Sequence, residues 1–60
     1  MQVYVGEFTE SDLNAGKDKE LVAEAMEKTG MKYTNTKMVK KRGKIVSIKI
    51  WVCDFSDVKV

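Results

Sequence analysis

Most of the side chains that could bind a charged ligand lie in one run of cations, between residues 37 and 49. The run consists of Lys37, Lys40, Lys41, Arg42, Lys44 and Lys49. Such side chains attract phosphate groups without regard to base sequence. Tyr33 and Trp51 flank the run, and aromatic rings can stack on exposed bases, each stack contributing about 1–3 kcal/mol. The pattern predicts a binding site for single-stranded nucleic acid or RNA.

The charge is also sorted along the chain. Residues 1–30 hold three lysines and seven acidic residues, a net charge of −4. Residues 31–60 hold eight cations and two acidic residues, a net charge of +6. An anionic partner would therefore meet the second half of the chain.

The same residues support other interpretations. Lysines on an edge strand also prevent pairing with other chains, and Tyr33 and Trp51 could stabilise the sheet as a cross-strand pair. Tyrosine, tryptophan and arginine dominate protein hot spots. The alternative function is therefore a protein-binding inhibitor or antitoxin-like module that docks on a larger enzyme through Tyr33 and Trp51. The partner is either nucleic acid or a larger protein.

Catalysis is not expected, because the chain has no histidine, the usual general base at neutral pH. Cys53 is followed by Asp54, whose charge disfavours a reactive thiolate, so we expect Cys53 to be a packed apolar residue. Asp54 and Asp57 are typical of turns. One thiol without histidine cannot form a tetrahedral zinc site. We expect no catalytic residue, no metal, no cofactor and no small-molecule substrate.

The length of 60 residues indicates one domain, residues 1–60. A chain this short buries too little surface for high stability, and its single cysteine cannot form an intramolecular disulfide. A partner chain, which could be a second copy in a homodimer, is the expected stabiliser. Nothing near Met1 resembles a targeting signal and no apolar run spans a membrane, which predicts a cytoplasmic protein without membrane contact.

The first half of the chain predicts one strand and one helix. Residues 2–8 alternate as a strand, with Val3 and Val5 on one side and Tyr4 and Phe8 on the other. Residues 9–16 have the composition of a loop. Asp18 is the expected N-cap of a helix that ends at Gly30.

The second half predicts two strands around Arg42 and Gly43. We favour a type I turn with a one-residue bulge at Gly43, which sets Tyr33 opposite Trp51. A two-residue turn would instead place Lys37 and Asn35 on the same face as the apolar residues Val46, Ile48 and Ile50. Burying an unpaired lysine is costly, so the bulged turn is preferred.

Residues 45–52 form the most apolar strand, which is expected at the centre of the sheet. The predicted fold is α+β: a small β-α-β-β domain whose three-stranded sheet has the order 1-3-2, with one helix packed on one face. The tail is expected to add a short edge piece, with Phe55 folding back. One helix leaves the other sheet face uncovered, and we expect an interaction site there. The residues expected on that face are Tyr33, Trp51, Val39 and Ile45, with Lys37, Lys40 and Lys49 around them.

Overall fold

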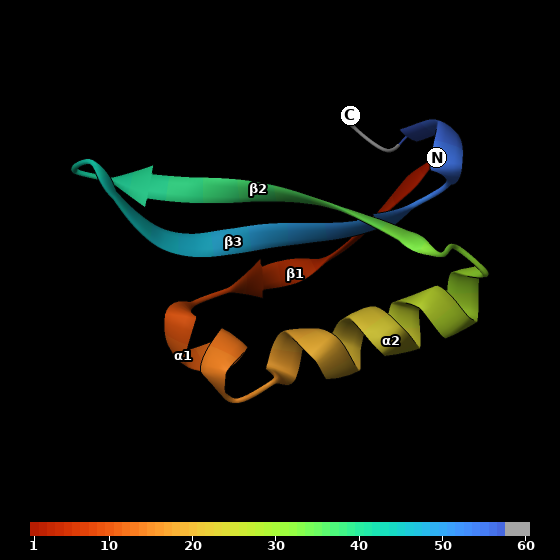
Figure 1. The fold of residues 1–60 in the computed structure, drawn as a ribbon, viewed down its shortest axis with the longest axis horizontal. Helices are drawn as coiled ribbons and strands as arrows, with labels where there is room; N and C mark the ends of the chain where they lie inside the picture. Colours follow the sequence, from red (N-terminus) through yellow and green to blue (C-terminus); the bar gives the residue numbers. More distant parts are fainter. Residues whose placement is uncertain (58–60) are drawn as a thin grey trace.

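A computed structural model describes residues 1–57 and shows a three-stranded antiparallel sheet with one long helix packed against it (Figure 1). The strands have the order β1-β3-β2, and β3 is antiparallel to both neighbours. The predicted α+β fold and strand order are therefore confirmed. The elements are β1 (Gln2–Phe8), α1 (Glu10–Asn14), α2 (Lys17–Thr29), β2 (Tyr33–Lys41), β3 (Lys44–Cys53) and the 3-10 turn η1 (Phe55–Asp57).

The core lies where α2 crosses β1 and β3. Its buried apolar residues are Phe8, Met31, Ile50 and Val52. Cys53 is also buried, but on the other side of the sheet, opposite Tyr33. The helix contributes only half-buried side chains, such as Val22 and Met26, and it packs mainly against β1 and β3 (Figure 1). The core is therefore thin, and the face of the sheet opposite α2 is left open.

A β-bulge in β1 changes which side chains share a face. Tyr4 pairs with Trp51 and Gly6 pairs with Ile50, so Val5 is the extra residue. Because one extra residue reverses the alternation, Phe8 is buried on the helix side while Tyr4 is 50% exposed on the opposite face. The prediction that these two rings share a side is wrong.

The segment predicted as a loop, residues 9–16, contains the short helix α1. Thr9 is its N-cap: the Thr9 hydroxyl accepts from the Asp12 N–H, and the Asp12 carboxylate accepts from the Thr9 N–H at 3.1 Å. The predicted N-cap of the long helix is also wrong, because α2 begins after Gly16, whose left-handed backbone has φ 76°. Asp18 lies instead in the first turn of α2. Gly30 ends the helix as predicted.

Replacing Thr9 with alanine is expected to lower the free energy of unfolding by about 1 kcal/mol, because the cap of α1 is lost. Hydrogen bonds from Thr9 and the charge of Lys17 hold the pKa of Asp12 below the ordinary value of an aspartate. The Asp12 contribution is therefore present above that value and is lost as the pH falls through the lowered pKa. Denaturant unfolding at pH 7 and at pH 3 measures both effects. Thr9→Ser should retain most of the stability, and equal stability of the alanine variant would contradict the capping role.

The β2–β3 hairpin closes through a two-residue turn, not through the predicted bulged one. Lys41 pairs with Lys44, and the two turn residues, Arg42 and Gly43, have φ values of 52° and 77°. Two successive left-handed residues produce the hairpin turn whose twist matches the strands. Arginine rarely adopts this conformation, so Arg42 occupies an uncommon backbone region in this turn.

A second bulge, at Val46, keeps Lys37 off the helix side of the hairpin. Val39 pairs with Ser47 and Lys40 pairs with Ile45, so Val46 has no partner residue on β2. The two-residue turn alone would fix which β3 side chains point to the helix side. The extra residue exchanges the two faces for the part of β3 that follows Val46. The lysine burial that argued against this turn is therefore avoided.

The cross-strand partners nevertheless differ from the prediction by two positions. Tyr33 lies opposite Cys53, and Trp51 lies opposite Asn35. The predicted Tyr33–Trp51 pairing is wrong, but a shift of two residues keeps both rings on the open side of the sheet.

The segment after β3 turns back over the open side of the sheet and does not extend its edge. In η1 the Asp57 N–H donates to the Asp54 carbonyl at 3.0 Å, so both aspartates are turn residues. The remainder of the predicted edge piece, residues 58–60, lies outside the described residues. Within residues 1–57, no helix has the length and apolar character needed to cross a membrane.

Candidate functional site

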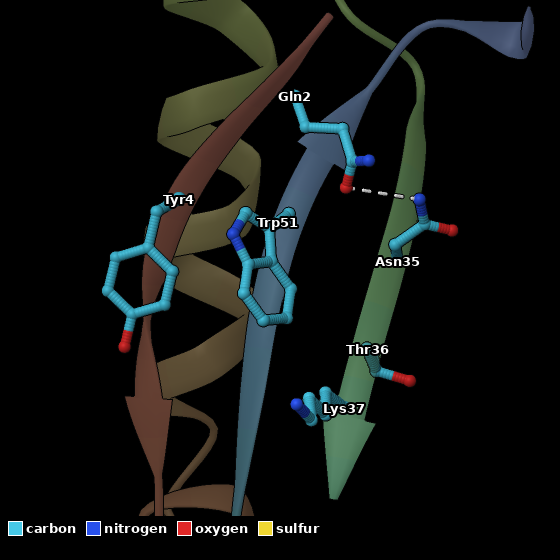
Figure 2. Close-up of a pocket in the computed structure, with 6 residues that line it drawn as sticks. All are labelled: Gln2, Tyr4, Asn35, Thr36, Lys37 and Trp51. Atoms are coloured by element: carbon cyan, nitrogen blue, oxygen red, sulfur yellow. Dashed lines mark hydrogen bonds between the residues drawn. The ribbon is translucent and has the colours of Figure 1, made fainter. Parts of the chain in front are cut away.

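The candidate site is the sheet face opposite α2, which we call the open face. Figure 2 shows side chains from all three strands projecting on this side, with α2 behind the sheet. Tyr4 of β1, Trp51 of β3 and Asn35 of β2 form one row across it, because the first two are paired and the last two are paired. Neighbouring strands lie about 4.8 Å apart, so these three side chains are direct neighbours.

The centre of the open face is aromatic. The rings of Tyr4 and Trp51 have centroids 5.4 Å apart and planes tilted by 58°. The Trp51 side chain is half-buried and that of Tyr4 is half-exposed. Part of each ring is therefore available to a ligand.

An open pocket of about 640 Å³ lies beside these rings (Figure 2). It is lined by Gln2, Tyr4, Asn35, Thr36, Lys37 and Trp51. The Asn35 amide nitrogen donates to the Gln2 amide oxygen at 3.2 Å and to the Asp57 carbonyl at 2.8 Å. The pocket thus combines aromatic surface, two amides and one cation, which suits a planar ligand that carries hydrogen-bonding groups.

The next row along the strands is charged. Lys37 of β2 lies directly opposite Lys49 of β3, and Glu7 of β1 lies on the other side of Lys49. Glu7 accepts a hydrogen bond of 2.5 Å from the Ser47 hydroxyl. Like charges directly opposite each other destabilise a sheet. The lysine pair therefore lowers the free energy of unfolding of the protein when no ligand is bound.

A second lysine pair flanks the hairpin turn, where Lys41 lies opposite Lys44. Alternation along β2 places Lys41 on the same face as Lys37. Across residues 1–57, no carboxylate lies within 4.0 Å of any of the six hairpin cations. The open face therefore carries four lysines whose charge is not neutralised by a close ion pair.

Two residues predicted for this face, Lys40 and Ile45, lie elsewhere. Lys40 pairs with Ile45, and alternation from Val39 places that pair on the helix side of the hairpin. Arg42 lies at the tip of the turn and belongs to neither face. The structure thus brings Lys37, Lys49 and Trp51 together, and it separates Lys40, Ile45 and Arg42 from them.

Tyr33 lies on the open face but contacts a different ring from the one predicted. Its ring centroid is 5.6 Å from that of Phe55, with an edge-on angle of 63°. Phe55 therefore does fold back toward the sheet, as predicted. Cys53, opposite Tyr33, is fully buried, which confirms the prediction that it packs as a small apolar residue.

Sequence reasoning missed Tyr4, Gln2 and Asn35 as site residues. The signal for Tyr4 was Gly6, since glycine inside a strand often marks a bulge. Nothing in the sequence distinguished the two amides from ordinary surface residues.

The described residues contain no cluster of three or more histidine, cysteine, aspartate or glutamate side chains that could hold a metal ion. No family model, curated protein or solved structure matches the chain. Inference about function therefore depends on the open face itself. Its rings offer stacking surfaces and its lysines offer charge to an anionic ligand.

Proposed function

We propose that this protein binds single-stranded nucleic acid on the open face. In this proposal a base stacks against Trp51 and Tyr4, and phosphates lie along the Lys37–Lys49 and Lys41–Lys44 pairs. The observation that carries the proposal is the juxtaposition of a partly exposed ring pair with a directly opposed lysine pair on one sheet face. A polyanion that carries planar bases is complementary to both features.

The alternative is a protein partner that docks on the same rings. Aromatic residues alone do not distinguish the two ligands, because they are also typical of protein interfaces. The lysine pairs favour nucleic acid, since a regularly repeating anion can neutralise two successive pairs along a strand. A protein partner is retained as one outcome of the test below.

The proposal is tested by titrating the protein with fluorescently labelled 12-nucleotide single strands, one of DNA and one of RNA, at two salt concentrations. For single strands, the logarithm of affinity falls with the logarithm of salt by about 0.7 per phosphate contact. If all four open-face lysines contact phosphates, a plot of log affinity against log salt concentration should have a slope of roughly −3. Absence of binding at low salt by folded protein would overturn the proposal and favour a protein partner.

Lys37→Ala with Lys49→Ala should reduce the magnitude of the salt slope by about 1.4, because two phosphate contacts are lost. The same double variant should be at least as stable as wild type, since the like-charge pair is removed. Fluorescence anisotropy and thermal melting measure the two quantities.

The matched control is Lys17→Ala with Lys19→Ala, which removes the same charge from the start of α2. The control should leave the salt slope close to that of wild type. An equal loss of affinity in both double variants would mean that only net charge matters, and would contradict the assignment of the open face.

A further inference from the structure

The open face carries a second pair of rings next to the first. Tyr33 is 42% exposed and Phe55 is 75% exposed, although their centroids are only 5.6 Å apart. Phe55 is thus one of the most exposed large apolar side chains of the described chain. Packing of the core does not explain an exposed phenylalanine in this position.

Phe55 is nevertheless held in place through the rest of η1. The Asn35 amide nitrogen donates to the Asp57 carbonyl at 2.8 Å, and Asn35 belongs to the same row as Trp51. The Asp57 carboxylate also accepts a hydrogen bond from the Met1 amino group. The turn that carries Phe55 is therefore anchored to β2 and to the start of β1.

The two ring pairs follow each other along the strands. Tyr33 lies opposite Cys53, which is two residues beyond Trp51 in β3. Residues two apart in a strand point to the same side and are separated by about 6.8 Å. The lysine pair Lys37–Lys49 lies one row on the other side of Trp51.

We infer that the open face takes two successive bases, one at the Tyr4–Trp51 pair and one at the Tyr33–Phe55 pair. This inference rests on the proposed function and assigns Phe55 as a nucleic-acid-binding residue. The strand then continues over Lys37 and Lys49 toward the hairpin turn. It does not continue beyond Phe55, because the carboxylates of Asp54 and Asp57 lie there in ion pairs with the Met1 amino group. Together these three groups offer no net positive charge to a phosphate.

The test compares binding of the labelled 12-nucleotide strands by wild type and by Phe55→Ala. Loss of one base stack predicts an affinity reduced by roughly 5- to 150-fold. Phe55→Leu keeps apolar volume without a ring and should lose a similar amount. The control is Met38→Ala, which truncates a 55% exposed side chain opposite Ile48 on the helix side of the sheet and should bind like wild type. Thermal melting of each variant verifies folding.

A length series gives an independent readout. Wild type should bind a dinucleotide several-fold more tightly than a mononucleotide, while Phe55→Ala should show little gain from the second base. If Trp51→Ala weakens binding but folded Phe55→Ala does not, the second base-binding position at Tyr33–Phe55 is overturned. The proposed function then stands. If no single strand binds the wild-type protein at all, the proposed function fails together with this inference.

Discussion

Replacing Trp51 with alanine is expected to lower the affinity for single-stranded nucleic acid by roughly 5- to 150-fold, the value of one base–aromatic stack. Trp51 lies at the centre of the open face, in contact with the Tyr4 ring and beside the pocket. Its loss removes the larger ring of the pair and widens the pocket. The affinity is measured by anisotropy of a labelled strand, because this variant lacks the only tryptophan of the chain.

Trp51→Phe is the matched variant, because it keeps an aromatic face on the same strand. It should retain most of the affinity, while the alanine variant should not. Because Trp51 is half-buried, circular dichroism must first show that both variants are folded. Equal binding by a folded alanine variant would remove Trp51 from the site.

Replacing Phe8 with alanine has the largest expected effect on stability, a loss of about 3–5 kcal/mol. Phe8 is only 4% exposed and is one of five buried apolar side chains in residues 1–57. A domain of this size has a total stability of about 3–9 kcal/mol, from roughly 0.05–0.15 kcal/mol per residue. The variant should therefore be largely unfolded, or melt tens of degrees lower, when followed by circular dichroism.

The matched control for Phe8 is Leu21→Ala on α2. Leu21 is 46% exposed, so its truncation removes much less buried surface and should cost less than about 1.5 kcal/mol. A Phe8 variant that melts close to wild type would mean that the core does not depend on the ring that the β1 bulge directs inward.

The strand order could be predicted because it depends on features that extend over whole segments. Ile45 to Val52 is the most apolar strand, which favours the central position in the sheet. The helix that ends at Gly30 connects two strands that run parallel to each other, on either side of that central strand. The local irregularities could not be predicted in the same way. The bulges at Val5 and Val46 each depend on a single extra residue whose side chain is an ordinary β-former.

Single-residue bulges also explain why only part of the candidate site could be predicted. Lys37, Lys49 and Trp51 lie farther from the turn than both the predicted bulge at Gly43 and the observed bulge at Val46. Each bulge adds one residue, so the predicted faces of these three residues are correct. Ile45 lies next to the Val46 bulge, and its face was predicted wrongly. The bulge after Tyr4 makes the predicted shared side of Tyr4 and Phe8 wrong as well. A bulge exchanges the faces of every residue beyond it, so errors in site prediction concentrate at the strand ends.

The most direct test of the account is the emission of Trp51 itself, since it is the only tryptophan and lies in the proposed site. Addition of an unlabelled single strand should quench this emission to a saturating value, and a duplex of the same sequence should quench it much less. Emission that is unchanged by either strand at low salt, from protein shown to be folded, would contradict the claim that the open face binds nucleic acid.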